Sequence, residues 1–162
     1  MEAISVAASI AGLVGIAGQA ISGVIKLDGF IQDVKELDGR TESLTKEARS
    51  LAITLNHVKS LLESLGGAPA QSDTSPWNAK VAELSLHLKD CHNDLVEWTS
   101  PADARPRHSS KRQRIIDAIR NRRLREISGI ESKIERHRSQ LSVDLGALTR
   151  YTAVGNEGSN CD

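Results

Sequence analysis

Three side chains near the middle of the chain have the types that bind metals. His87 and Cys91 are four residues apart and share one face of a helix, and His92 follows directly. A zinc site needs three or four ligands. The remaining histidines lack paired spacing: His57, His108 and His137. We therefore expect no metal, no cofactor and a Cys91 that packs in the core.

The sequence also has no recognisable nucleotide-binding or catalytic motif. The glycines Gly12, Gly15 and Gly18 follow no strand and precede no Lys-Ser/Thr, so they are typical of helix packing rather than nucleotide binding. No Ser/His/Asp or Cys/His arrangement stands out. The carboxylates of one predicted helix are expected on solvated faces: Glu83, Asp90, Asp94 and Glu97. We expect that the protein is not an enzyme.

A basic block is the strongest charge feature. Between Arg105 and Arg125 the chain has nine Lys or Arg residues and one acid, Asp117, a net charge of +8 over 21 residues in a chain of zero net charge. The basic residues are Arg105, Arg107, Lys111, Arg112, Arg114, Arg120, Arg122, Arg123 and Arg125. Lipid headgroups and nucleic acid phosphates both attract such a cluster. The block has no aromatic residue for base stacking, which makes a nucleic acid the weaker alternative.

The longest uncharged stretch runs from Ala3 to Ile25, 23 residues of Ala, Gly and Ser interleaved with Ile, Val and Leu. As a helix it rises about 1.5 Å per residue, enough to cross a hydrocarbon core of roughly 30 Å. Glu2 stands where a secretory signal has basic residues, which argues against such a signal. Three alternatives stay open: a core helix surrounded by neighbours, a permanent membrane anchor, and a helix that is buried at rest and inserts when triggered.

Small residues recur four apart within this stretch. Ala7, Ala11 and Gly15 form one row, with Ala8 and Gly12 beside it. This row predicts a smooth strip that another helix backbone can approach closely, in a bundle or in lipid. The larger residues form the opposing stripe: Ile10, Leu13, Val14, Ala17, Ile21 and Val24.

The rest of the chain has helical periodicity. Heptad seams run from Leu44 to Leu65 and from Trp77 to Trp98, and a third apolar face runs from Ile127 to Leu148. A short helix is expected within the basic block. Aromatic residues are few, so the core must consist of aliphatic side chains. The two widely separated cysteines indicate a reducing cytosol rather than a disulfide framework.

The breaks between these segments follow from Gly, Pro and capping residues. Asp28-Gly29 is expected to kink or break the first helix, and Asp38-Gly39 to stop it, with Thr41 as the next N-cap. Ser75 is expected to cap the third helix. The fold class is thus an all-α bundle of four to six helices over residues 1–152, followed by a flexible tail over 153–162.

Three segments carry a resemblance to a known family: MEAISVAASIAGLVGIAGQAISGVIKL at the start, Glu-Ala-Arg-Ser-Leu in the second helix, and IERHRSQLSVDLGAL in the last. Together they resemble the fungal HeLo-like domain, found at the N-terminus of fungal NLR-like (STAND) receptors and in related cell-death proteins. The resemblance implies a helical bundle for signalling or execution in programmed cell death and innate immunity. It also implies an N-terminal helix that inserts into the plasma membrane, where oligomers permeabilise it.

Our leading hypothesis is a cytoplasmic bundle recruited to an anionic membrane, where its first helix inserts and the protein forms a homo-oligomer. The expected insertion residues are Glu2, Ile4, Val6, Ile10, Gly12, Leu13, Val14, Gly15, Ile16, Gly18, Ile21, Val24 and Ile25. The nine basic residues named above are the expected contacts to anionic phospholipid. The alternative is a protein-interaction domain, such as an adaptor for an NLR-like receptor, without membrane activity.

Overall fold

The structure is a computed structural model that describes residues 2–33, 38–66, 75–99 and 124–157, with side chains described over 9–32, 42–66, 76–99 and 128–153. This part of the chain forms four α-helices: α1 (Glu2–Asp33), α2 (Asp38–Gly66), α3 (Ser75–Thr99) and α5 (Leu124–Glu157). The prediction of an all-α bundle is confirmed.

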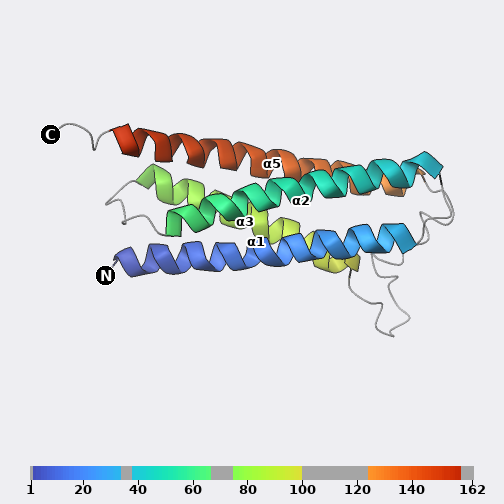
Figure 1. Ribbon diagram of the computed structural model, residues 1–162, viewed down its shortest axis with the longest axis horizontal. Coiled ribbons are helices and arrows are strands. Elements are labelled where there is room, and N and C mark those ends of the chain that lie inside the picture. Colours follow the sequence, from blue (N-terminus) through green and yellow to red (C-terminus); the bar gives the residue numbers. More distant parts are fainter. Residues whose placement is uncertain (1, 34–37, 67–74, 100–123, 158–162) are drawn as a thin grey trace.

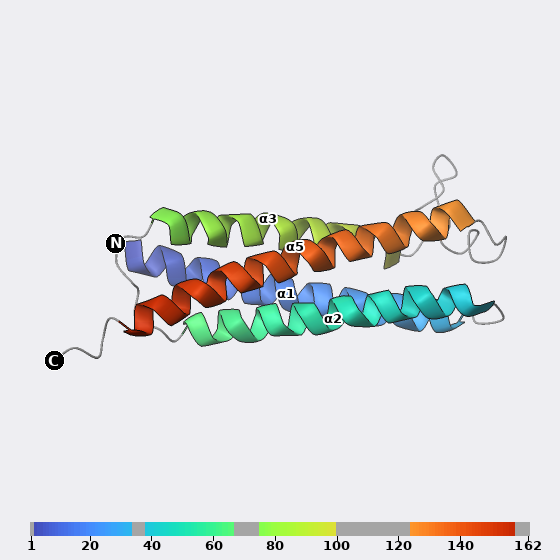
Figure 2. The ribbon, with the colours of Figure 1, turned by 90° about the horizontal axis from the view of Figure 1, so that it is seen from above.

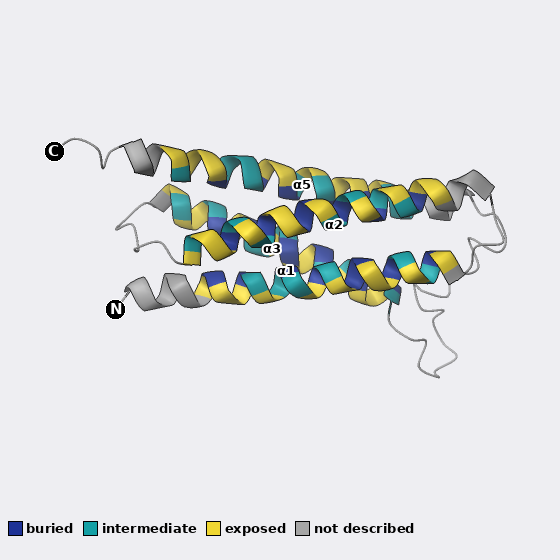
Figure 3. Ribbon diagram, in the orientation of Figure 1, coloured by how far each residue is buried: buried dark blue, intermediate teal, exposed yellow. Residues whose placement is uncertain are grey.

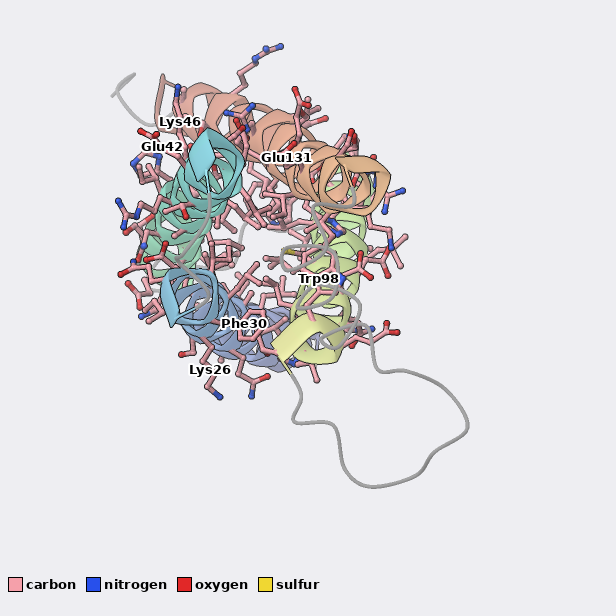
Figure 4. All side chains as sticks on the ribbon, turned by 90° about the vertical axis from the view of Figure 1, so that its right-hand side faces the viewer. Lys26, Phe30, Glu42, Lys46, Trp98 and Glu131 are labelled. Atoms are coloured by element: carbon pink, nitrogen blue, oxygen red, sulfur yellow. The ribbon has the colours of Figure 1, made fainter. Side chains whose placement is uncertain are left out.

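The helices form a ring in the order α1, α2, α5, α3 (Figures 1 and 2). Helix α1 packs against α2 and α3, and α5 packs against the same two helices from the other side. Successive helices run in opposite directions, so α1 and α3 are parallel neighbours whereas α3 and α5 are antiparallel neighbours. Helices α1 and α5 therefore lie diagonally across the bundle, as the view along its axis shows (Figure 4).

The predicted seams make the core. Each buried seam residue lies on the inward side of its helix because steps of three and four keep one face in register. The buried members in α2 are Leu44, Ala48, Leu51, Leu55, Val58 and Leu62, and those in α3 are Val81, Leu84, Leu88, Cys91, Leu95 and Trp98. From α1, Leu13, Ala17, Ala20, Val24, Leu27 and Ile31 complete the layer (Figure 3).

Helix α1 is unbroken at the Asp28-Gly29 pair. It continues through this pair as far as Asp33, so a break there is wrong. Leu27 and Ile31 are buried on either side of Gly29, and the amide of Gln32 donates a 2.8 Å hydrogen bond to Asp28 across it. Packing and this bond outweigh the helix penalty of one glycine, which is about 1 kcal/mol.

Two other helix ends also differ from the prediction. Helix α2 begins at Asp38 rather than at Thr41, which places Asp38-Gly39 inside the helix instead of before it. An acidic residue is favourable at a helix N-terminus in general, because that end has unpaired backbone N–H groups and a partial positive charge. Helix α5 continues to Glu157, so residues 153–157 of the predicted tail are helical. The remainder of that tail, and most of the predicted short basic helix, lie outside the described residues.

Candidate functional site

The predicted insertion residues lie on all sides of α1. Three are buried in the bundle (Ile10, Leu13 and Val24), four are half-buried (Val14, Ile16, Gly18 and Ile21), and three are exposed (Gly12, Gly15 and Ile25). Glu2, Ile4 and Val6 belong to α1, but their side chains lie outside the described part. In the described part of the chain, α1 packs against α2 and α3, buries one face in the core and leaves residues of the other face exposed, so these neighbours do not surround it on all sides.

The described members of the small-residue strip, Ala11, Gly12 and Gly15, lie on the exposed face of α1. A β-carbon added to Gly12, Gly15 or the nearby Gly18 would meet no neighbouring atom within 4 Å. These three glycines therefore do not make the close helix contact that the spacing predicts. The outer surface of the strip consists of backbone and small uncharged side chains.

The close contact between α1 and α3 is made by a glycine outside the predicted strip. Gly23 is buried, and a β-carbon on it would lie 3.1 Å from the β-carbon of Leu95. This distance is shorter than an ordinary carbon contact of about 3.5–4.0 Å. The sequence does not single out Gly23, because the identity of its neighbour depends on the order of the helices in the ring.

Next to this contact, an open groove of about 370 Å³ runs between α1 and α3. Its α1 wall is formed by Gly15, Gly18, Gln19, Ser22, Gly23 and Lys26, and its α3 wall by His92, Val96 and Thr99. The exposed ammonium group of Lys26 marks the end of the uncharged segment and points away from the bundle (Figure 4). The groove therefore lies between the small residues on the exposed face of α1 and the half-exposed Val96 of α3.

The side chains of all nine predicted lipid-contact residues lie outside the part of the chain that the structure describes. Arg105, Arg107, Lys111, Arg112, Arg114, Arg120, Arg122 and Arg123 lie outside the described residues. Arg125 lies in the first turn of α5, and its side chain is not described. The basic block therefore remains a prediction from the sequence.

Polar side chains connect α3 and α5 inside the bundle. His87 Nδ1 lies 2.6 Å from Asp144 Oδ2, and His137 Nε2 lies 3.0 Å from Asp94 Oδ2. Asp144 and His137 are both buried, with 2% relative exposure each. The expectation that Asp94 only solvates a surface is wrong, because it pairs with His137 and, at 3.6 Å, with Lys133.

Helix α2 is tied to both of its neighbours by polar contacts. Arg49 lies 3.5 Å from Asp28 of α1. On the other side, Arg138 of α5 donates a 3.1 Å hydrogen bond to Ser50 and lies 3.8 Å from Glu47. These contacts are partly exposed, so each contributes modestly to stability.

The thiol at the centre of α3 has no reactive character. Burial, and secondarily the charge of Asp94, raises the pKa of Cys91 to about 12. A thiolate is the form that binds metals and attacks electrophiles, and it is disfavoured here. Among the residues that the structure describes, no three His, Cys, Asp or Glu side chains gather as metal ligands.

One described helical segment, Ser9–Gln32, is long and apolar enough to cross a membrane by length and composition, a test that soluble core helices and signal sequences also pass. Only 33% of its most apolar window is buried in the bundle. Comparison with known proteins gives no family: no protein-family model, no curated protein and no solved structure matches the chain.

Proposed function

We propose that the protein is a membrane-directed signalling or cell-death domain in which α1 inserts into an anionic membrane and associates with other copies. The proposal extends the resemblance to HeLo-like domains described above. The observation that carries it is the uncovered face of α1, which bears no charge from Ala3 to Ile25.

The uncharged outer face of α1 differs from the outer faces of the other helices. They present charged side chains to solvent, such as Glu42 and Lys46 on α2 (Figure 4). A helix that is apolar on its inner face and uncharged on its outer face has no side that requires water. Such a helix fits two environments, the edge of this bundle and a lipid bilayer.

When α1 leaves the bundle, its inner face loses the free energy of burial that the bundle provides. A lipid bilayer offsets this loss of free energy. Leu13, Val24 and Leu27 are nearly inaccessible to water in the bundle. Burying an aliphatic side chain of this size contributes about 1.5–3 kcal/mol. An acyl-chain environment restores this contribution, whereas release into water does not. We therefore expect α1 to leave the bundle at a membrane rather than in solution.

The small-residue strip then supplies a surface for association between copies. In lipid, helices associate through small residues that allow their backbones to approach closely. Gly12 and Gly15 are open in the single copy and are available for such a contact. The homo-oligomer forms through this strip in our proposal.

The basic block supplies the first attraction to the membrane. Each Lys or Arg near an anionic surface contributes about 1 kcal/mol. The protein would thus reside in the cytoplasm and be recruited to the plasma membrane, with an NLR-like receptor as a possible activating partner.

Dye leakage from phosphatidylserine-containing vesicles tests the proposal. We expect Gly15→Glu to lower leakage about tenfold or more, because a charge at the centre of an inserted helix costs about 2.5–3.5 kcal/mol. Gly15 lies near the middle of the Ala3–Ile25 segment and is exposed, and a β-carbon on it would meet no neighbouring atom within 4 Å, so the bundle should tolerate the change. Val143→Glu, at the exposed Val143 of α5, is the matched control and should leave leakage unchanged.

Two results would count against membrane insertion. Equal leakage from the two variants would show that α1 does not enter the bilayer. A wild-type protein that neither binds nor permeabilises these vesicles would favour the protein-interaction alternative.

A further inference from the structure

The groove between α1 and α3 has one wall from each of two parallel helices. Glycines make much of the α1 wall, and a β-carbon on Gly18 would meet no neighbouring atom within 4 Å, so a larger side chain would fit there. The volume of about 370 Å³ falls in the range of small-molecule sites, which is about 300–1,000 Å³. The groove is therefore large enough for one small polar ligand or one lipid headgroup.

The charge of the groove favours an anion. Lys26 is the only Lys or Arg among the described residues that line it, and none of those residues is Asp or Glu. The side chain of Lys26 is exposed and forms no ion pair with another described residue. An ammonium group on a flexible stem can turn onto a nearby phosphate oxygen. One cation without a partner matches an occupant with a single negative charge.

The polar side chains of the groove favour an occupant that also carries hydroxyl groups. The amide of Gln19 makes no hydrogen bond with another described residue, and Nδ1 of His92 is buried without a hydrogen-bond partner. The hydroxyls of Ser22 and Thr99 already donate to carbonyls of their own helices, so their oxygens remain as acceptors. A bare anion cannot donate to these oxygens, whereas a hydroxyl can both donate and accept.

The end of α3 points to the same chemistry. The helix ends at Thr99, and the last carbonyls of a helix have no intrahelical partner and carry a partial negative charge. A multiply charged anion is disfavoured next to such an end, and a hydroxyl donor is favoured there. The groove therefore suits a ligand that turns its hydroxyls to α3 and its charge to Lys26 of α1.

Exposed apolar side chains lie close to this end of the groove. Ile25 of α1 is 64% exposed, and Val96 of α3 is 47% exposed. Both are within two residues of the contact between Gly23 and Leu95, where the two helices meet. They can contact the ester and acyl part of a lipid whose headgroup lies in the groove. A free phosphate would use neither side chain.

We propose that the groove binds the headgroup of a singly charged phospholipid that carries hydroxyl groups, while α1 is still packed in the bundle. The phosphodiester contacts Lys26, the hydroxyls contact Ser22 and Thr99, and the ester end lies at Val96. This inference rests on the proposed membrane function and names the lipid that the closed bundle meets first. Because α1 and α3 each supply one wall, the bound headgroup stabilises the closed bundle, and α1 inserts only after the headgroup leaves.

NMR titration of the intact protein with dihexanoylphosphatidylglycerol, below the concentration at which it forms micelles, tests the inference. We expect the backbone amide signals of Gly23 and Val96 to shift and to saturate. Dihexanoylphosphatidylcholine has the same chains and the same phosphate but no net charge and no hydroxyl. It should bind at least about tenfold more weakly, because it loses the hydroxyl contacts and brings a second cation to Lys26.

Two pairs of variants locate the binding site. Gly18→Leu fills the groove and should lower the affinity for phosphatidylglycerol about tenfold or more, whereas Gly29→Leu should not. Gly29 is the matched control because its β-carbon position is equally open and it does not line the groove. Lys26→Gln should weaken binding about tenfold, since it removes a charge-assisted hydrogen bond. Lys89→Gln, at an exposed position on α3, removes the same charge and should have no effect.

Three results would overturn the inference. These are equal affinity for the two lipids, equal loss of affinity within either pair of variants, and saturation of the same signals by inorganic phosphate at similar affinity. The last result would assign the groove to free phosphate. Phosphatidylglycerol should also raise the urea midpoint of the wild type and of Gly29→Leu, but not that of Gly18→Leu.

The titration uses no vesicles, so its outcome is separate from that of the leakage assay. Headgroup binding without leakage would contradict membrane insertion and leave the lipid site in place. Leakage without headgroup binding would overturn the lipid site and leave insertion in place.

Discussion

Gly23 of α1 lies so close to Leu95 of α3 that a β-carbon on the glycine would stand 3.1 Å from the β-carbon of the leucine. A β-carbon on Gly12, Gly15, Gly18 or Gly29 of the same helix would meet no neighbouring atom within 4 Å. Gly23 therefore allows a close approach of α1 to α3, whereas Gly12 and Gly15 leave room for a side chain on the outer face.

This difference predicts opposite stability effects for two matched substitutions. Gly23→Leu should lower the free energy of unfolding by about 1–3 kcal/mol, because the added side chain overpacks the α1–α3 contact. Gly15→Leu should leave it unchanged or raise it by up to about 1 kcal/mol, because the site is open and leucine favours a helix. Urea denaturation followed by circular dichroism measures both values. Equal losses in the two variants would contradict the described placement of α1.

The His87–Asp144 pair predicts a non-additive mutant cycle. His87→Leu should cost about 1–3 kcal/mol, because it leaves the buried carboxylate of Asp144 without its donor. Adding Asp144→Leu should recover most of that loss, since a buried polar pair can be exchanged for apolar side chains at little cost. Denaturation of His87→Leu, Asp144→Leu and the double variant at neutral pH gives the coupling energy. Simple additivity would show that the pair does not interact.

The raised pKa of Cys91 predicts a loss of stability at high pH. The folded thiol, whose pKa is about 12, keeps its proton up to about that pH, whereas an unfolded thiol loses it near its ordinary pKa of 9.0. The unfolded state therefore binds fewer protons between these values, and the free energy of unfolding falls as pH rises, by at most about 1.4 kcal/mol per unit. Comparison of Cys91→Ala with the wild type, both carrying Cys161→Ser, isolates this slope from other groups. The slope should be shallower in the alanine variant, and an identical slope would exclude the buried thiol as its source.

The basic block predicts charge-dependent recruitment to vesicles. Changing Arg120, Arg122, Arg123 and Arg125 to Glu should weaken cosedimentation with phosphatidylserine vesicles by about 100-fold or more, at about 1 kcal/mol per charge. Wild-type binding should also weaken as salt is raised, because the attraction is screened.

A charge-matched control separates position from net charge. It changes four exposed basic residues elsewhere on the described helices to Glu: Lys46, Lys89, Arg136 and Arg150. Both variants have the same net charge, so only a position-dependent interaction makes the block variant weaker. If both variants lose vesicle binding equally, the attraction depends on the net charge of the protein and not on the position of the basic block.

The sequence predicts the core more fully than it predicts the site. Leu44 to Leu62 follow an unbroken heptad, and such a pattern fixes which face is buried whatever the neighbour is. The sequence does not point directly to the His–Asp pairs between α3 and α5, because Asp94 fits a solvated face of α3 and the polar residues His137 and Asp144 do not belong to the apolar stripe of α5. The shared His-x6-Asp spacing of α3 and α5 was the available signal.

The functions of the glycines could not be assigned from their spacing. Gly15 and Gly23 lie in the same small-residue segment, yet one is open and the other is against Leu95. Which glycine faces a neighbour depends on the order of helices around the ring, and heptad patterns do not encode that order. The continuation of α1 through Gly29 likewise depends on tertiary packing, which overrides local propensity.

The most direct test of membrane insertion is the depth of α1 in vesicles to which the protein is bound. A fluorophore is attached to Gly15→Cys or, as a control on the opposite side of the bundle, to Val143→Cys, both with Cys161→Ser. The buried Cys91, with its raised pKa, should not react. We predict that lipids with quenchers in their acyl chains quench the fluorophore at position 15 and leave that at position 143 bright. Equal quenching at the two positions, or none at position 15 in vesicle-bound protein, would contradict the account.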